Sequence, residues 1–315
     1  MNDCQLQTPI VFVIFKRPNT TEKVFEVIRQ IKPSQLLVIA DGARADRPDE
    51  AEKCAAARAV IDCVDWDCEI FKNYSDINLG CAKRVSSGLD WVFNIVEEAI
   101  ILEDDCVPHP TFFRFCEELL ERYRYDSRIA SISGQNVQFG RKRTEYSYYF
   151  SRYNHCWGWA TWRRAWQHFD FHLKLWPEIK EKKFLHDILD SDPHAVEYWT
   201  KTFQSLYDGS GLEDSWAHRW TFACWINSSL GVLSNENLIS NIGFGLSEAT
   251  HDMGKRSPYN SMPTQALQFP LKHPPFLIRD RQADSFTHNT LFNFSVSQRI
   301  KLKVQRSVKQ LLKGL

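Results

Sequence analysis

The chain has 315 residues, of which 43% are hydrophobic and 25% charged, values typical of a soluble globular protein with one large α/β domain or two smaller ones. Its formal net charge is zero, so composition gives no electrostatic support for a nucleic-acid partner. Six of the 39 basic residues and no acidic residue lie in 299–315, which leaves 33 basic against 39 acidic side chains elsewhere. Three features predict a cytoplasmic protein. The nine cysteines are scattered and form no CxxC pair, and residues 1–8 lack a signal-peptide pattern. The sequence also has no apolar run of membrane-spanning length.

Apolar runs of strand length alternate with helical patterns in the first part of the chain. The expected strands are 10–15, 36–40, 68–71, 99–102 and 129–133, and the expected helices are 20–32, 49–61, 81–96 and 112–125. Continuous apolar runs such as IVFVIF are typical of strands that are buried on both faces. Strands and helices that alternate at this spacing predict an α/β fold over residues 9–135, with a mostly parallel sheet and helices on both faces.

The pattern changes after this region. Residues 136–177 are rich in Tyr and Trp, and within them we expect Trp162 and Trp166 to be helical and to point inward. The later expected elements are helices at 195–207 and 215–228 and short strands at 230–233 and 238–240. Residues 243–254 contain three glycines without periodicity, which predicts a mobile loop.

The C-terminal segment 299–315 has the pattern of a basic amphipathic helix. Its apolar residues on one face are Val304, Val308, Leu311, Leu312 and Leu315. Such a helix suits peripheral contact with an anionic membrane surface. A frayed basic tail or a helix packed on the body of the protein is the alternative.

Three consecutive acids, Glu103, Asp104 and Asp105, follow the apolar run 99–102. A buried parallel strand that ends in acids places their charge at the edge where open α/β sheets bind ligands. Adjacent carboxylates repel one another, so a shared cation stabilises them, and oxygen ligands of this kind suit Mg2+ or Mn2+. An acidic loop that is simply solvated is the alternative.

Arg17 and Asp41 also follow expected parallel strands, so the topology should bring them to the same edge. A carboxylate there can accept from a base N–H or a ribose hydroxyl, while a guanidinium can face a phosphate. A structural ion pair explains the same two residues without a ligand.

This order of motifs resembles the GT-A class of nucleotide-sugar glycosyltransferases. In that class a metal-binding DxD-type motif stands where Glu103, Asp104 and Asp105 stand here. The segment ILEDDCVPHPTFF is most similar to the N-acetylglucosaminyltransferase I group, and the chain also resembles bacterial family-2-like glycosyltransferases. The similarity covers roughly 9–255, within a glycosyltransferase domain at 1–255. It implies a nucleotide-sugar-binding half at 9–135, a smaller aromatic-rich acceptor and catalytic-base half at 136–255, and a C-terminal extension at 256–298 before the basic tail.

The resemblance also implies roles for individual residues. Asp105 would bind the metal, while Glu103 and Asp104 would contact the ribose, the sugar or metal-bound water. Arg17 and Asp41 would line the uridine or phosphate side of the donor. The loop and helix that close over the donor would carry Asn78, Gly80 and Lys83. A divalent cation suits this chemistry because it neutralises a departing nucleoside diphosphate.

An inverting transferase also needs a carboxylate that takes the proton of the acceptor hydroxyl. In the resembled group this base is an aspartate just before a Trp at a helix start, which points to Asp214 and then to Glu213. The group has Asp-Asp-Trp, whereas Ser215 intervenes here, so both acids remain candidates. A helix N-cap is the structural alternative for this segment.

Two further segments match parts of the resembled group. Its Gly-Trp segment corresponds to Trp157, Gly158 and Trp159, whose rings would form the acceptor platform, with core packing as the alternative. Its Ser-His loop, which orders over the diphosphate, corresponds to Ser247 and His251, for which an exposed histidine is the alternative.

Together these features predict a Mn2+- or Mg2+-dependent glycosyltransferase. It would transfer a sugar from a nucleoside diphosphate, with UDP favoured, to a hydroxyl of a glycan or lipid-linked acceptor in bacterial surface-polysaccharide or glycolipid assembly. One alternative is a sugar-1-phosphate nucleotidyltransferase, which needs a glycine-rich basic loop after the first strand, whereas residues 16–19 read KRPN. The other is a non-catalytic carbohydrate-binding protein.

Asp214→Asn is expected to preserve donor binding and to remove turnover, because the amide cannot accept the proton of the acceptor hydroxyl. Donor affinity by calorimetry and turnover with an acceptor check the two halves of this prediction. Normal turnover in Asp214→Asn would assign the base to another residue, with Glu213→Gln as the next variant.

Overall fold

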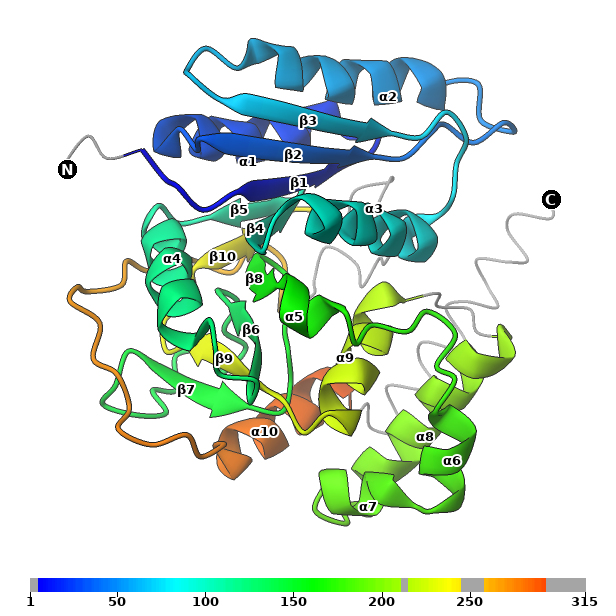
Figure 1. Cartoon of the computed structure of the whole chain (residues 1–315), viewed down its shortest axis with the longest axis vertical. Helices are drawn as coiled ribbons and strands as arrows, with labels where there is room; N and C mark the ends of the chain where they lie inside the picture. Colours follow the sequence, from blue (N-terminus) through cyan, green and yellow to red (C-terminus); the bar gives the residue numbers. More distant parts are fainter. Residues whose placement is uncertain (1–4, 211–214, 245–257, 293–315) are drawn as a thin grey trace.

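The computed structural model describes residues 5–210, 215–244 and 258–292. Within these residues the chain forms a central eight-stranded sheet and a separate two-stranded ladder (Figure 1). In spatial order the strands of the central sheet are β3 (Glu69–Tyr74), β2 (Gln35–Ala40), β1 (Ile10–Ile14), β4 (Glu98–Glu103), β8 (Trp159–Trp162), β6 (Ile129–Ser133), β9 (Leu230–Ser234) and β7 (Tyr148–Ser151). The ladder pairs β5 (Cys106–Pro108) with β10 (Ile239–Asn241).

The half of the sheet that contains β1 is parallel, as the sequence predicts. β1 pairs in parallel with β2 and β4, and β2 pairs in parallel with β3. β9 is parallel to β6, whereas β8 and β7 run antiparallel to their neighbours. Ile10 lies beside Leu36 on one side and Ile100 on the other, so β1, β2 and β4 end at one edge. The α/β class with a mostly parallel sheet is confirmed.

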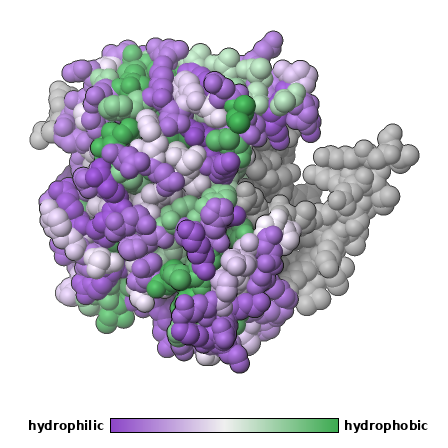
Figure 2. All heavy atoms as spheres, turned by 45° about the vertical axis from the view of Figure 1, so that its right-hand side comes forward, coloured by the Kyte–Doolittle hydropathy of each residue, from purple (hydrophilic) through white to green (hydrophobic). Residues whose placement is uncertain are grey.

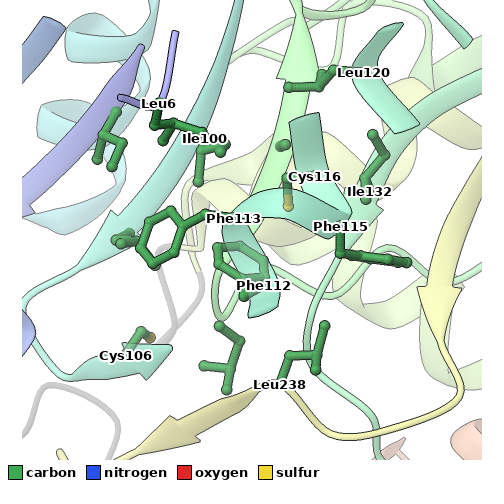
Figure 3. Packing of buried hydrophobic residues seen from close by; sticks show 14 of the residues in the cluster. Leu6, Ile100, Cys106, Phe112, Phe113, Phe115, Cys116, Leu120, Ile132 and Leu238 are labelled. Carbon is green, nitrogen blue, oxygen red and sulfur yellow. The ribbon is translucent and has the colours of Figure 1, made fainter. Parts of the chain in front are cut away.

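One face of the sheet is covered by α1 (Pro18–Ile31) and α4 (Thr111–Tyr123). Successive strand residues point to opposite faces, and Ile100 points to this one. Figure 3 shows Phe112 and Phe113 of α4 at the centre of this cluster, with their ring centroids 5.5 Å apart. After β2 the chain forms α2 (Glu50–Ala59) and η1 (Val60–Cys63), and both contact α1.

The opposite face is covered by α3 (Cys81–Ile95), α5 (Arg163–Trp166) and α9 (Trp216–Ile226). Val11 and Ile101 point to this side and pack against apolar side chains of these helices. Helices therefore lie on both faces of the sheet, and side chains from both sides enclose its strands.

A further group of helices packs against α9 on the side away from the sheet (Figure 1). Its members are α6 (Trp176–Glu181), α7 (Phe184–Ile188) and α8 (Pro193–Asp208). Trp199, Phe203 and Trp225 form its buried centre. The described C-terminal part ends in α10 (Arg281–Thr287) and η2 (His288–Phe292).

The face of the molecule in Figure 2 is mainly polar. Figure 2 shows hydrophilic side chains over much of the visible face, with hydrophobic residues in separate patches. Among the residues that the structure describes, no helix combines the length and the apolar character that crossing a bilayer requires. The expected amphipathic segment 299–315 lies outside the described residues.

Two strands lie in the aromatic-rich region 136–177, where the sequence predicted none. Tyr148–Ser151 and Trp159–Trp162 form β7 and β8 inside the central sheet. The prediction that Trp162 is helical is wrong, because it is the last residue of β8, whereas Trp166 lies in α5 as expected. Both rings are buried, so the inward orientation predicted for them is confirmed.

Gly158, just before β8, has a packing role that the sequence did not predict. Its φ is +61°, and a Cβ at this position would lie 2.2 Å from Cδ1 of Ile239 in β10. The side chain of Ile239 therefore occupies the space that a residue other than glycine would need. Gly209, which follows α8, has a similar φ of +63° with no atom within 4 Å of a built Cβ.

Gly158→Ala is expected to lower the free energy of unfolding by about 1–3 kcal/mol more than Gly209→Ala. Both variants carry the strain of a left-handed alanine, so their difference isolates the clash with Ile239. Urea unfolding of both variants measures it. Equal losses in the two variants would contradict the close packing of Gly158 on Ile239.

Candidate functional site

The parallel strands β1 and β4 deliver the charged side chains of the candidate site to one edge of the sheet. β4 ends at Glu103, which is followed directly by Asp104 and Asp105. β1 ends at Ile14 and α1 begins at Pro18, whose fixed φ suits the first turn of a helix. The short link between β1 and α1 therefore carries Lys16 and Arg17 to the same edge as the acids.

Arg17 bridges two of the acids. Its Nη1 lies 2.8 Å from Oδ2 of Asp105, and its Nη2 donates to Oδ1 of Asp104. Oδ2 of Asp104 accepts from the backbone N–H of Phe15 at 3.3 Å. The exposed fractions of the three charged side chains are 15% for Arg17, 4% for Asp104 and 13% for Asp105, so these ion pairs are largely shielded from water. Burial alone would lower the pKa of Arg17, but Asp104 and Asp105 raise it above its usual value.

The acids carry more negative charge than Arg17 can balance. Burial, followed by repulsion from Asp105 and Asp104, raises the pKa of Glu103 to about 8. Burial also raises the pKa of Asp104 to about 6, although Arg17 opposes this change. A pKa of about 8 keeps Glu103 largely protonated at neutral pH, so Asp104 and Asp105 carry the negative charge opposite the single guanidinium, and the site favours additional positive charge.

The ladder strand β10 and the residues after it close the other side of Asp105. Asn241 Nδ2 lies 3.5 Å from Oδ1 of Asp105, and the backbone N–H of Ile242 donates to the Asp105 carbonyl at 2.8 Å. A Cβ on Gly243 would lie 2.1 Å from Oδ2 of Asp105 and 2.8 Å from Nη1 of Arg17. Only a residue without a side chain fits there. The sequence did not identify Asn241 or Gly243 as site residues, although a glycine just after a short strand is a signal of close backbone approach.

Asp105 and its neighbours offer few protein ligands to the expected divalent cation. Among the described residues, no three His, Cys, Asp or Glu side chains are arranged to hold a metal ion together. Mg2+ and Mn2+ need fewer protein ligands where substrate phosphates and water complete the shell, and one or two carboxylates are then sufficient. Asp105 fits that arrangement in charge and in ligand type.

Asp41, at the end of β2, has a different set of partners. Its Oδ1 accepts from the backbone N–H groups of Gly42 and Leu79 at 3.0 and 2.9 Å. Its Oδ2 accepts from Nδ2 of Asn78 and the backbone N–H of Gly80 at 3.1 and 3.0 Å. Four protein donors therefore occupy both oxygens, and the carboxylate fixes the turn before α3. The structure thus brings Asp41, Asn78 and Gly80 together, while Lys83 is exposed on α3.

Arg84 and Arg58, which no sequence motif singled out, bind backbone carbonyls at the ends of β2 and β3. Arg84 of α3 donates to the carbonyls of Ala40 and Asn73 at 3.1 and 2.6 Å. Arg58 of α2 donates to the carbonyls of Asp41 and Ser75 at 3.0 and 2.8 Å. Their contacts are to backbone oxygens of distant segments, so no local motif marks them in the sequence.

The three residues of the expected acceptor platform, Trp157, Gly158 and Trp159, have different surroundings in the structure. Trp157 is half-buried, and its ring packs edge-on against Phe244, with centroids 5.2 Å apart. Trp159 is 1% exposed and stacks on Trp216 at 5.6 Å inside the core, so it offers no ring face to an acceptor. Gly158 accommodates Ile239. Trp157 therefore packs against Phe244, the residue after Gly243.

Four other expected site residues lie outside the described residues: Glu213, Asp214, Ser247 and His251. The helix cap considered for the segment 213–215 belongs to Ser215, whose Oγ accepts from the backbone N–H of His218 at 3.3 Å.

Comparisons with known proteins give only distant likenesses. No family and no curated protein matches the chain. A UDP-glucose pyrophosphorylase solved with UDP-glucose is similar at 12% identity and a TM-score of 0.27, over 46% of this chain and 62% of that chain. A 4-diphosphocytidyl-2C-methyl-D-erythritol synthase from Anaerococcus prevotii is similar at 11% identity and a TM-score of 0.30, over 59% of this chain and 84% of that chain. Likenesses of this strength carry no argument about function.

Asp41→Asn is expected to lower the free energy of unfolding by about 1–3 kcal/mol, because the new amide nitrogen faces N–H donors in either orientation. Hydrogen exchange at the Leu79 and Gly80 amides should accelerate in the same variant. Asp76→Asn, an exposed change in the neighbouring loop, is the control. Unchanged exchange at both amides in Asp41→Asn would contradict this role of Asp41.

Proposed function

We propose that the protein is a glycosyltransferase that uses a nucleoside-diphosphate sugar, with UDP favoured, and a hydroxyl acceptor. The observation that carries this proposal is the Arg17–Asp104–Asp105 group at the shared edge of β1 and β4. It combines a guanidinium, which suits a phosphate, with carboxylates, which suit a divalent cation. Both are groups that recognise a diphosphate leaving group.

The proposed reaction assigns a separate task to each residue. Arg17 would bind a phosphate oxygen of the donor, and Asp105 would hold Mn2+ or Mg2+. When bound, such a cation neutralises charge on the diphosphate as the glycosidic bond breaks. The acceptor oxygen bonds to the anomeric carbon, the bond from that carbon to the diphosphate oxygen breaks, and the hydroxyl proton passes to a carboxylate. The candidates for that carboxylate remain Asp214 and Glu213.

A sugar-1-phosphate nucleotidyltransferase is the main alternative, because it would use the same edge of a similar sheet. The link after β1 argues against it. Nζ of Lys16 contacts Oε1 of Glu50 at 2.5 Å, so a carboxylate already neutralises this lysine, and Arg17 is the one basic side chain of the link left for a phosphate. The link also lacks glycine, which allows a backbone to wrap closely around phosphates.

Asp105→Ala is expected to reduce metal-dependent sugar transfer by at least about 100-fold with little change in melting temperature, since the cation loses its protein ligand. Transfer from a panel of nucleotide sugars to a mixed hydroxyl acceptor set, with and without Mn2+, measures the effect. Asp46→Ala removes an exposed carboxylate and serves as the charge-matched control.

Full activity in Asp105→Ala would overturn the assignment of Asp105. Release of pyrophosphate from a nucleoside triphosphate by the wild type would instead support the nucleotidyltransferase. Donor binding without transfer or hydrolysis would support a non-catalytic carbohydrate-binding protein.

A further inference from the structure

Arg17 and Asp105 neutralise each other in this structure, yet the proposed function gives each of them a ligand of its own. Nη1 of Arg17 is 2.8 Å from Oδ2 of Asp105, and its Nη2 contacts Asp104. Oδ1 of Asp105 already has Sγ of Cys106 at 3.4 Å and Nδ2 of Asn241 at 3.5 Å. Arg17 therefore cannot turn Nη1 to a phosphate, and Asp105 cannot turn Oδ2 to a cation, while their contact lasts.

The two halves of the bridge differ in how firmly they are held. Asp104 is the more deeply buried acid, and the backbone N–H of Phe15 fixes its second oxygen at 3.3 Å. Asp105 is more exposed, and within the described residues its other oxygen has contacts only to Sγ of Cys106 at 3.4 Å and to Nδ2 of Asn241 at 3.5 Å. The contact to Asp105 is therefore the one that can open, while Asp104 keeps hold of the guanidinium.

We infer that Arg17 is a displaceable counter-ion, which neutralises Asp105 until a divalent cation and a diphosphate replace it together. Nη2 remains on Asp104 as a pivot, and Nη1 moves from Asp105 to a phosphate oxygen. A Cβ on Gly243 would meet both Asp105 and Arg17, so the glycine leaves room for the contact between these two side chains. This inference rests on the proposed function, because it assumes a diphosphate donor at this edge.

The exchange makes the two ligands depend on each other. A cation alone must displace Arg17 and leaves its Nη1 without an anionic partner. A diphosphate alone meets a guanidinium that two carboxylates already neutralise, with those carboxylates repelling it. When both ligands bind, the cation contacts Asp105 and the diphosphate contacts Arg17. Each ligand therefore raises the affinity of the site for the other by linkage.

The test is Mn2+ binding to the full-length chain without nucleotide, followed by electron paramagnetic resonance. Arg17→Ala is expected to bind Mn2+ about tenfold or more tightly than the wild type, because the competing cation is gone. UDP affinity at saturating Mn2+ should fall about tenfold or more in the same variant, since the phosphate contact is lost. Arg29→Ala, which removes a partly exposed arginine from α1, should change neither affinity.

Unchanged or weaker Mn2+ binding in Arg17→Ala, with wild-type binding of Mn2+ and UDP intact, would overturn the inference and leave the proposed function standing. Failure of the wild type to bind UDP even with Mn2+ would overturn both. If Arg17→Ala does not fold, Arg17→Lys replaces it. The lysine cannot bridge both aspartates, so a smaller gain in Mn2+ affinity is expected, and no gain would contradict the inference.

Discussion

The negative charge that three consecutive acidic residues place at the end of one buried strand is the constraint on which the candidate site depends. Parallel pairing of β1 with β4, in which Val13 lies beside Glu103, brings the link after β1 alongside these acids. Arg17 then reaches both Asp104 and Asp105. One guanidinium balances part of this charge, and the remainder explains why the edge is suited to a cationic or cation-bound ligand.

The rest of the fold holds this edge in place. Helices on both faces bury the strands, so the positions of their ends are fixed by packing. Asp41 ties the end of β2 to the turn before α3, and Arg84 and Arg58 bind carbonyls at the ends of β2 and β3. The ladder of β5 and β10 brings Asn241 and Gly243 to Asp105. A rigid frame of this kind pre-positions charged groups before a ligand binds.

Sequence patterns predicted the features that depend on local order along the chain. Apolar runs located β1, β2, β4 and β6, and the convergence of Arg17 with the acids followed from parallel topology. The strands β7 and β8 escaped prediction because Tyr148–Ser151 and Trp159–Trp162 are short aromatic runs without a regular alternation. The burial of Trp159 and the contact of Gly243 with Asp105 depend on residues far away in the sequence. No local pattern encodes them.

In the proposed reaction this edge of the sheet binds a nucleoside diphosphate together with a divalent cation. The melting temperature of the wild-type protein with UDP alone, with Mn2+ alone and with both measures this binding directly. A ligand that binds only the native state raises the melting temperature, so the rise with both ligands is expected to be clearly larger than the sum of the separate rises. No rise with UDP and Mn2+ together would contradict it.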